Sequence, residues 1–588
     1  MTRRDVLIAM VWSAVLAALL LPLARIGIDP HHDGVMLKPA LDVLSGQVLF
    51  RDSFMQYGAV SCYLQAMALA IHRTLLAVRI LTVVTMVAVL FISYAAWRLI
   101  LPRSLASVAC LLFVLYVPAY ERDPWNHEYW LLLPWSSEFA MMFQAVGLYA
   151  LCRVIRGEQP ERWAVVVGMA TAAVFWCRQP VGGMMIGCLI VVWPALRWTG
   201  WTPAASSPRI ILGRMVGGFL IVNGFLLGGI ALTGALPAWW YQNVIWPARW
   251  SQSIKWGDTL WLFVHPQACA GLLGLWLALA APAWARRFRP DLPRSMIAIY
   301  FLCLGAGLIW QRQWVLEVVA IRDGGWSGLL PLIIIVQAAL SIRQALVTRD
   351  APKPTEYYLV AATAAIALGS LLQFYPVADS WHMYDALAPF LGLCVYAFWR
   401  WTGWPAARVA IGLTAALLPA IWGRAMAIGP AVHRPLVTLE QPEVLRGMRV
   451  PPEQAHSFGL IADAINRITR LQPDLPSTLI GDHALYLCFG KNMENPTPYF
   501  VTWRGLASQP VNLQRWQYIH DVRPMLILQR ARWEAVNEFY RGSRYVPVLW
   551  VPAEELEIAI PQELADRLGI SIYGAVPGYR LGRAKVFP

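Results

Sequence analysis

Charged residues are scarce in this sequence. Only 14% of its 588 residues are Asp, Glu, Lys or Arg, acidic residues number 34 against 48 basic ones, and hydrophobic residues make up 58%. A chain this apolar, with many long hydrophobic runs, is predicted to be a polytopic membrane protein rather than a soluble enzyme. The net charge of +14 does not indicate a nucleic-acid partner, because most Arg and Lys lie in the gaps between apolar runs, as membrane topology requires.

Several common motifs are missing as well. The nine cysteines include no CxxC pair and mostly fall inside apolar runs, so we expect small buried hydrophobic residues rather than a disulfide framework or a zinc site. The sequence has neither a GxxxxGK[ST] phosphate loop nor a GxGxxG turn between a strand and a helix, so no nucleotide site is predicted. No internal repeat or low-complexity segment is found.

What the sequence does contain is a series of apolar segments near the length of about 20 residues that crosses a bilayer. The first follows MTRRD without a small-residue cleavage site after it, so we expect an uncleaved span. We predict thirteen membrane helices, at residues 5–27, 77–97, 104–119, 138–154, 163–177, 181–197, 212–233, 264–285, 295–312, 328–343, 357–374, 386–400 and 408–428.

Loop charges orient these spans. If the N-terminus is cytoplasmic, alternate loops collect Arg3, Arg4, Arg98, Arg103 and further arginines with few acids, which is the positive-inside pattern. The opposite loops hold most of the acids. Residues 1–428 are therefore predicted to form a transmembrane catalytic domain with a first outer loop at 28–76, and an odd number of spans places residues 429–588 on that outer side.

The last 160 or so residues differ in character. Amphipathic helical patterns at AHSFGLIADAINRITRL, LQRWQYIHDV and RWEAVNEFYRG alternate with strand patterns at STLIGD, PMLILQ and YVPVLWV. This alternation predicts a small extracytoplasmic α/β domain with a mainly parallel sheet, which the final GYRLGRAKVFP closes as a hairpin or edge strand.

Carboxylates gather in the first outer loop. The stretch IDPHHDGVMLKPALDVLSGQVLFRDSFMQYG holds Asp29, Asp33, Asp42 and Asp52 beside two histidines. The part VMLKPALDVLS is predicted to form a short amphipathic helix on the bilayer surface, with Asp33 at its N-terminus, where the helix dipole favours the ionised form. Asp33 therefore either caps this helix or serves as a general base.

Further outer-loop clusters add polar groups. The segment AYERDPWNHEYW at 119–130 is either a solvated loop or part of a site, and FYPVADSWHMYDALAP at 374–389 brings a histidine whose partner is not evident. An arginine between two apolar stretches, in FWCRQPVGG, is a functional candidate because an ionisable group at membrane level is costly unless it is paired or lines a wet cavity. Arginine also binds phosphate with two donors at once.

These segments resemble a known group. The series begins with HHDG and continues with LSGQVLFRDSFMQYGAVSCYLQAMAL and the arginine of LLAVRIL. It resembles the first outer loop of bacterial GT-C superfamily glycosyltransferases, which are integral membrane enzymes that use polyprenyl-phosphate sugars. This chain departs from the family pattern with Phe50 before Arg51 and with Ala59 where proline is usual, but the acids remain. Arg178-Gln179, FYPVADSWHMYDALAP and GDHALYLCFGKNMENPTPYF are similar to further family segments.

The resemblance implies an inverting transfer of a sugar from a polyprenyl-phosphate donor to an acceptor hydroxyl on the outer face of the bacterial inner membrane. A carboxylate would take the proton of that hydroxyl, a step that general-base catalysis speeds by about 10² to 10⁴, and fixed positive charge would receive the lipid phosphate. Asp33 is the predicted base with Asp29 as second choice, and Asp52 and Asp123 orient the acceptor or the base. We assign the donor phosphate to Arg178 with Arg312 or Arg322, and substrate binding to His32, Arg51, Tyr57, Glu121, His127, Asp379 and His382.

Other partners and functions follow from the same pattern. We expect a monomer in the bilayer that acts on a glycan, a lipid or a protein acceptor. No metal is predicted, because the adjacent side chains of His31, His32 and Asp33 diverge and make a poor chelate for a divalent cation. The alternatives are a secondary transporter or lipid flippase, which tends to carry paired repeats, and a ligase or polymerase supplied with a pyrophosphate-linked glycan.

Overall fold

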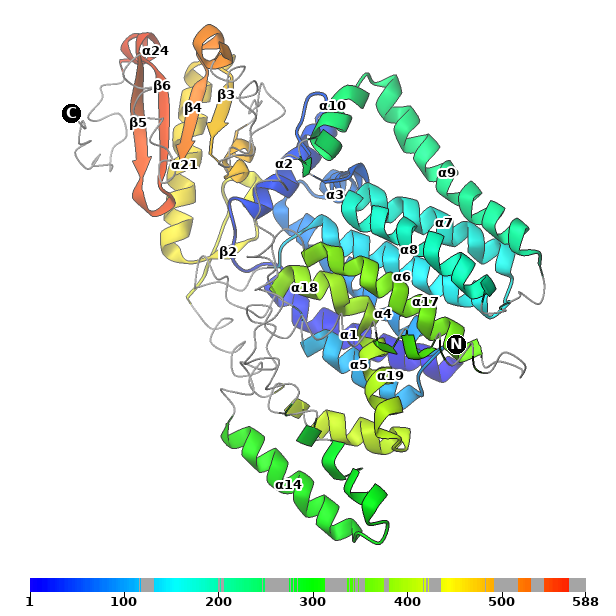
Figure 1. Ribbon diagram of the computed structural model, residues 1–588. Helices are drawn as coiled ribbons and strands as arrows, with labels where there is room; N and C mark the ends of the chain where they lie inside the picture. Colours follow the sequence, from blue (N-terminus) through cyan, green and yellow to red (C-terminus); the bar gives the residue numbers. More distant parts are fainter. Residues whose placement is uncertain are drawn as a thin grey trace.

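The computed structural model describes most of the chain (Figure 1). The residues outside the description are 56, 116, 118–131, 199–200, 202–205, 246, 249–273, 275–276, 279, 283, 312–335, 338, 342, 344–346, 348–354, 375–379, 416, 419–420, 422–434, 482, 491–516, 530–543 and 570–588.

The first part of the chain is helical. Its elements are α1 (Arg3–Leu23), α2 (His32–Leu44), α3 (Ala59–Ile71), α4 (Leu75–Trp97), α5 (Arg103–Leu115), α6 (Ser136–Ile155), α7 (Pro160–Cys177), α8 (Gln179–Trp198), α9 (Pro208–Leu232), α10 (Leu236–Trp240), η2 (Tyr241–Ile245), α14 (Arg294–Trp310), α17 (Thr355–Ser370), η4 (Leu371–Phe374), α18 (Ser380–Leu387), η5 (Ala388–Phe390) and α19 (Leu391–Thr402).

Five of the described helices, α1, α4, α6, α8 and α9, are long and apolar enough to cross a membrane. They coincide with predicted spans at 5–27, 77–97, 138–154, 181–197 and 212–233. Large apolar side chains on their outer faces are exposed, among them Met10, Ile190 and Phe225, as expected of surfaces that meet lipid. The chain is thus a multi-pass membrane protein.

The other predicted spans have mixed outcomes. The helices α5, α7, α14, α17 with η4, and η5 with α19 lie at five of them, but these helices are shorter or less apolar than the five candidate spans. The predicted spans at 264–285, 328–343 and 408–428 lie wholly or partly outside the described residues. The count of thirteen therefore stays a prediction.

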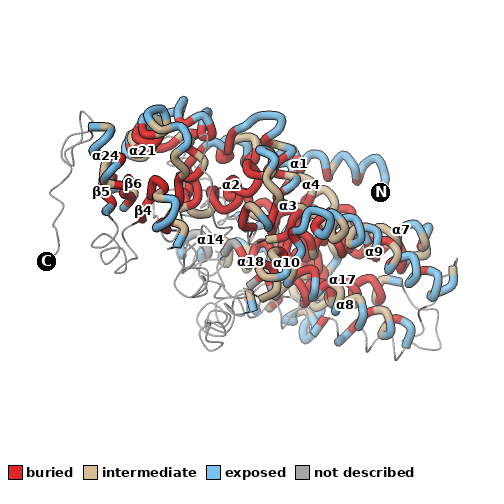
Figure 2. Tube along the Cα trace, turned by 90° about the horizontal axis from the view of Figure 1, so that it is seen from above, coloured by how far each residue is buried: buried red, intermediate tan, exposed pale blue. Residues whose placement is uncertain are grey.

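The first outer loop is more structured than predicted. It contains α3 as well as α2, and α2 does not present an open polar face, because its residues from Asp33 to Asp42 are all buried (Figure 2). Packing against α3, α4 and η7 surrounds α2 with protein. Its polar groups are satisfied internally: Lys38 pairs with Asp42, and the hydroxyl of Ser53 donates to Asp42 at 2.5 Å.

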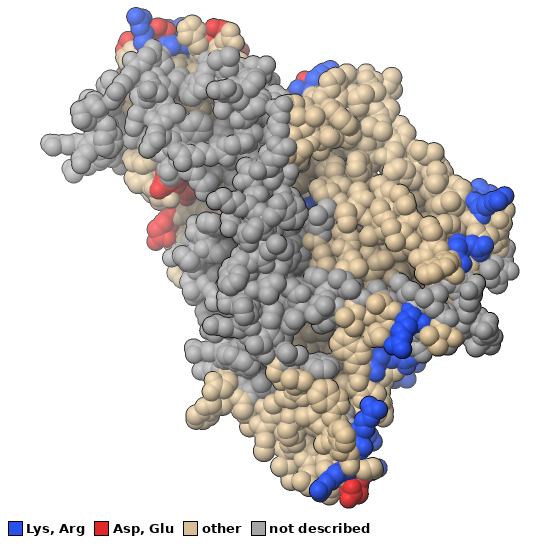
Figure 3. Space-filling view, in the orientation of Figure 1, with Lys and Arg blue, Asp and Glu red and all other residues tan. Residues whose placement is uncertain are grey.

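The helices are arranged between two poles. At the basic pole, Asp5 near the start of α1 binds Arg98 after α4 and Arg103 at the start of α5, with Asp5 Oδ1 at 2.9 and 2.7 Å from their Nε atoms. Thr2 and Asp5 also form a capping box that fixes the start of α1. Figure 3 shows Lys and Arg side chains along this side of the molecule. The other ends of α1 and α4, and α2 itself, lie at the opposite pole.

The C-terminal region carries the strands. Its elements are β1 (Val437–Thr438), η6 (Glu443–Leu445), β2 (Arg449–Val450), α21 (Pro452–Leu471), β3 (Ser477–Ile480), η7 (Ala484–Cys488), β4 (Met525–Gln529), β5 (Tyr545–Val551), η9 (Pro552–Glu554), β6 (Leu556–Pro561) and α24 (Gln562–Arg567). Helix α21 and strands β3, β4 and β5 lie where the sequence pattern predicted them, whereas RWEAVNEFYRG and GYRLGRAKVFP lie outside the described residues.

The prediction of a mainly parallel sheet was wrong. The four-stranded sheet has the order β3-β4-β6-β5, in which β3 pairs with β4 in parallel and the other two pairings are antiparallel. The difference comes from β6, which sequence reasoning missed. A tight turn through η9, in which Glu555 has a φ of 49°, folds β6 back onto β5 as a hairpin and inserts it beside β4.

Candidate active site

The site begins where α1 ends, at the short turn that leads into α2. The side chain of Asp29 is only 10% exposed. Its Oδ1 accepts hydrogen bonds from the backbone N–H groups of His31 and His32, at 2.8 and 2.9 Å, which satisfies donors that the first turn of a helix otherwise leaves open. Its Oδ2 lies 2.9 Å from Nδ1 of the His32 ring.

These contacts decide the charge of Asp29. Burial acts to raise the pKa of this carboxyl, but the neighbouring His32 and His31 and the backbone donor of His32 outweigh burial and hold the pKa far below its usual range. Asp29 is therefore ionised at neutral pH. The His32 side chain is 31% exposed, so the pair has a buried carboxylate behind a more accessible ring.

Asp33 has a different environment four residues further on. Nη2 of Arg79 lies 2.6 Å from its Oδ2, Nε of Arg79 lies 3.2 Å from its Oδ1, and the backbone N–H of Asp29 donates to Oδ2 at 2.9 Å. Both side chains of this pair are completely buried. Burial raises the pKa of Asp33, and the charge and hydrogen bonds of Arg79 oppose that rise. The pair joins α2 to α4, and Arg79 also donates to the Ile26 carbonyl at 3.0 Å.

Trp135, the residue before α6, connects the predicted site residues. Its ring centroid lies 5.2 Å from that of His32, 5.2 Å from that of His382 on α18, and 6.3 Å from that of Tyr57 before α3. The guanidinium of Arg178 lies over the ring of Tyr57, 5.7 Å from its centroid. One cluster thus contains Asp29, His32, Tyr57, Arg178 and His382, which the sequence had singled out in three separate segments.

Arg178 is held at the junction of α7 and α8. It is buried and donates a hydrogen bond to the hydroxyl of Ser137 in the first turn of α6. The buried carboxylate of Glu138, whose Oε2 makes no hydrogen bond to any described residue, interacts electrostatically with Arg178 and with Asp385. Sequence reasoning assigned no role to Trp135, Ser137 or Glu138, because the residues PWSS around the start of α6 carry no charge and Glu138 is the first residue of a predicted span.

Gly58 brings these segments together. Its N–H donates to the carbonyl of Cys177 at 3.0 Å, next to Arg178. A Cβ at this position would lie 1.9 Å from the carbonyl oxygen of Trp176, so only glycine allows this approach. The contact explains how Tyr57, just before α3, comes to lie against the guanidinium at the end of α7.

Arg51 and Asp52 lie in another part of the first loop. They form an exposed ion pair, with the Nε of Arg51 2.8 Å from Oδ1 of Asp52. The side chain of Arg51 lowers the pKa of Asp52, against a smaller opposing effect of burial. Arg51 also donates to the carbonyl of Thr233 at 3.1 Å, so its described contacts lead to the end of α9.

The C-terminal region packs against the turn that carries Asp29. The N–H of Leu485 in η7 donates to the Pro30 carbonyl at 3.1 Å, and the side chain of Gln454 on α21 donates to the Ile28 carbonyl at 3.2 Å. The hydroxyl of Tyr486 donates to Glu554 at 2.6 Å. Burial raises the pKa of both Tyr486 and Glu554, and the negative charge of Asp29 adds to both shifts, so this pair lies within electrostatic reach of Asp29.

Six predicted site residues lie outside the described part of the chain: Glu121, Asp123, His127, Arg312, Arg322 and Asp379. Their roles stay predictions. Among the described residues, no group of three or more His, Cys, Asp and Glu side chains is arranged to hold a metal ion. The expectation that no metal is required stays a prediction too.

Comparisons with known proteins found no matching family model and no matching curated protein. Similar solved structures include an oligosaccharyltransferase from Archaeoglobus fulgidus in complex with zinc and sulfate, at 12% identity and a TM-score of 0.45 over 94% of this chain and 73% of that one. Two structures of ArnT from Cupriavidus metallidurans are also similar, each at 14% identity and over 98% of that chain. The apo form matches 94% of this chain with a TM-score of 0.43, and the form bound to undecaprenyl phosphate matches 95% with a TM-score of 0.41.

Identities of 14% or less with TM-scores below 0.5 are too low to carry an activity, a substrate or the role of a residue from those proteins to this one. The function proposed below therefore rests on the motifs and on the geometry of this chain's own side chains.

Proposed function

We propose that this protein is an inverting membrane glycosyltransferase, which moves a sugar from a polyprenyl-phosphate donor to an acceptor hydroxyl. The observation that carries the proposal is the cluster around Trp135, where the ring of His32, held by Asp29, lies against the indole and Arg178 lies over Tyr57, which contacts the same indole. Attack of a hydroxyl on the anomeric carbon needs a proton acceptor on one side and a cation for the departing phosphate on the other. The cluster supplies both, and the motifs of the first loop support the same class of reaction.

The proton acceptor that we propose is the Asp29–His32 pair. The sequence pattern favoured Asp33, but both oxygens of Asp33 are engaged by Arg79 and its side chain is fully buried, so a substrate hydroxyl has no access to it. Asp29 holds the His32 ring through Nδ1, and we assign proton exchange with the acceptor to Nε2 of the same ring. The ionised carboxylate then stabilises the imidazolium that forms, as in other paired carboxylate and histidine sites.

Arg178 is the proposed contact for the donor phosphate. Its position between Ser137 and Tyr57 fixes the guanidinium, so little conformational freedom is lost when an anion binds. The low-dielectric surroundings at the ends of α6 and α7 strengthen its attraction for the charge that develops on the leaving phosphate. Trp135 and Tyr57 add flat aromatic faces against which a sugar ring can stack.

The side of the membrane follows from the two poles. The cluster lies at the pole opposite the arginines that bind Asp5. By the positive-inside rule the arginine-rich pole is cytoplasmic, so we propose that the site, together with the C-terminal region, faces the outside of the bacterial inner membrane.

Binding of undecaprenyl phosphate to the purified protein in nanodiscs tests the donor side of the proposal, with native mass spectrometry as the readout. We expect the parent protein to retain the lipid and R178Q to bind it at least tenfold more weakly, the usual order for loss of a charged hydrogen-bond donor. R294Q, which removes an exposed arginine at the start of α14, serves as the charge-matched control. Equal binding by R178Q and the parent would contradict the assignment. Lipid transport by proteoliposomes without any new glycosidic bond would favour the transporter or flippase instead.

A further inference from the structure

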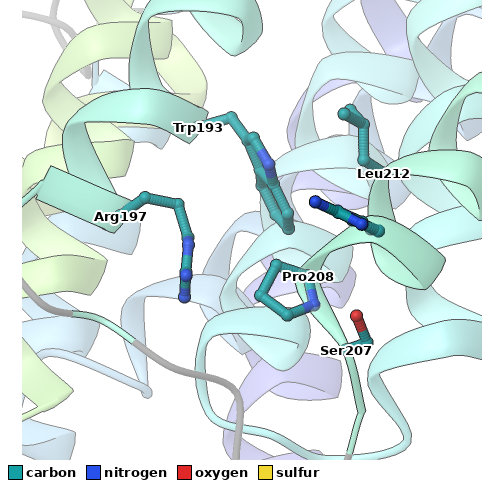
Figure 4. Close-up of a pocket in the computed structure, with 6 residues that line it drawn as sticks. Trp193, Arg197, Ser207, Pro208 and Leu212 are labelled. Atoms are coloured by element: carbon teal, nitrogen blue, oxygen red, sulfur yellow. The ribbon is translucent and has the colours of Figure 1, made fainter.

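A second cradle for an anion lies between the end of α8 and the start of α9. It is a hollow of about 450 Å³ lined by Trp193, Arg197, Ser207, Pro208, Arg209 and Leu212. Figure 4 shows Trp193 and Arg197 extending from α8 toward Pro208 and Ser207 at the beginning of α9. The lining therefore has a basic part, formed by Arg197 and Arg209, and an apolar part, formed by Trp193, Pro208 and Leu212.

Among the described residues, no carboxylate neutralises the positive charge of this hollow. Nη1 of Arg197 donates to the Trp201 carbonyl at 3.1 Å, and neither Arg197 nor Arg209 forms an ion pair with any carboxylate among the described residues. The nearby acid, Glu161, accepts a hydrogen bond from Ser206 at 2.8 Å and lies 3.9 Å from Arg214. Two guanidinium groups thus line one hollow, and no described carboxylate serves either of them as a counter-ion.

The start of α9 adds to this potential. Ser207 is the N-cap residue of this 25-residue helix, and its side chain makes no capping hydrogen bond. The first backbone N–H groups of a helix have no partner within the helix, and the helix dipole places positive potential at that end. A phosphate group in the hollow would meet the arginines and the start of α9 together.

The surroundings of the hollow indicate which phosphate compound binds. Among the five candidate spans, α9 is the least buried. Only 17% of its apolar 18-residue stretch is buried inside the protein, against 28% for α8. Leu212 lines the hollow and is 43% exposed, and Val216, one helical turn further along α9, is 48% exposed. An acyl chain attached to the bound phosphate would therefore continue along a lipid-facing surface.

We propose that this cradle binds the head group of one anionic phospholipid, with its phosphate on Arg197 and Arg209 and its acyl chains along α9. Basic pockets between membrane helices at the arginine-rich side are suited to such head groups. The cradle lies at the basic pole, so it is distinct from the cluster around Trp135, and the inference does not depend on the proposed transferase activity.

The test counts lipids that stay bound to the purified full-length protein in native mass spectrometry, after exchange into phosphatidylglycerol or phosphatidylcholine. We expect the parent to retain phosphatidylglycerol in preference to phosphatidylcholine, and the double variant R197Q/R209Q to bind it about 30-fold more weakly. R287Q/R289Q removes the same charge from two exposed arginines and should bind like the parent. Equal weakening in both double variants would overturn the proposal, since bulk charge would then account for the binding.

Two further measurements separate the outcomes. Glycerol phosphate and inorganic phosphate should fail to displace the lipid at concentrations that match it, and displacement by either would show a site for free phosphate instead. R197K/R209K keeps the positive charges but lacks the paired N–H donors of the guanidinium. Its affinity for the lipid should therefore lie between those of the parent and of R197Q/R209Q. Parent-like binding by R197Q/R209Q, with an unchanged thermal midpoint, would also overturn the proposal.

Discussion

Asp29 and Asp33 lie on one short turn, yet their side chains do different work. Asp29 caps the first turn of α2 and holds the His32 ring, whereas Asp33 forms a fully buried pair with Arg79. The sequence marked both acids and predicted that one of them is a base. The sequence could not separate the two acids, because Arg79, which binds the carboxylate of Asp33, lies 46 positions further along the chain. The two side chains meet only when α2 packs on α4.

Replacing Asp29 with Asn should abolish sugar transfer and leave the protein folded. Asparagine still accepts hydrogen bonds from the backbone N–H groups of His31 and His32, so α2 keeps its cap. It carries no charge to stabilise an imidazolium on His32. We expect transfer to fall by a factor of about 10² or more, with an unchanged elution profile and thermal midpoint. D463N, which changes an exposed acid on α21, is the control and should retain most activity.

Replacing Asp33 with Asn should destabilise the protein instead. The variant leaves the guanidinium of Arg79 buried without an opposite charge, and breaking a buried pair in this way costs about 3–5 kcal/mol. A large fall in the thermal midpoint of D33N, partly recovered in D33N/R79M, would support the structural role. A stable D33N that has lost all transfer would return the role of the base to Asp33.

Acid should weaken the turn at Asp29. Because the folded protein depresses the pKa of this carboxyl, its ionised contacts stabilise the fold at pH values above the ordinary carboxyl range, and this stabilisation is lost as the pH falls toward the depressed value. The parent should therefore lose more stability than D29N between pH 7 and pH 3, measured by thermal unfolding in detergent. Parallel losses in the two proteins would contradict the depressed pKa.

At the scale of elements, the placement of α2 decides the site. The period of apolar residues in VMLKPALDVLS predicted the helix correctly but put it on the bilayer surface. The helix is instead buried between α3, α4 and the C-terminal η7, a long-range contact that no local pattern encodes. The same holds for Trp135, which is recognisable as part of the site only after α3, α6 and α18 have converged on it.

Gly34 tests the contact between α2 and η7. A Cβ at Gly34 would lie 2.0 Å from the backbone nitrogen of Leu485, so G34A must push η7 away from the turn that holds Asp29. Overpacking of this kind costs about 1–3 kcal/mol and often more against backbone. G183A, on α8, is the matched control, since a Cβ there meets nothing within 4 Å. We expect a lower thermal midpoint and reduced activity for G34A only, and equal behaviour of both variants would count against the docking of η7.

At the scale of the whole molecule, the charges of the loops predicted that Arg98 and Arg103 lie on the same side as the N-terminus, and both bind Asp5 there. Which of the two poles is cytoplasmic stays a prediction. The number of spans and the sheet topology were less predictable. Strand β6 follows a tight turn and carries Glu557 between apolar residues, so its sequence gave no sign that it lies between β4 and β5. The C-terminal region packs on the turn that carries Asp29, so the strand-rich region and the helical domain meet beside the proposed site.

The two poles should lie on opposite sides of the membrane. A membrane-impermeant maleimide should label T438C in intact spheroplasts and label R4C only after lysis, because the first position lies in the C-terminal region and the second at the basic pole. The parent protein gives the background of its own cysteines. Labelling of R4C without lysis, with protection of T438C, would reverse the proposed orientation.

The most direct test of the central claim is mass spectrometry of products formed by the reconstituted protein. The parent and D29N are supplied with a panel of polyprenyl-phosphate sugars and an extract of cell-envelope acceptors. We predict that the parent forms a new glycosidic bond and releases polyprenyl phosphate with at least one donor, and that D29N, equally folded, does neither. Release and transfer by D29N at the rate of the parent would contradict the account.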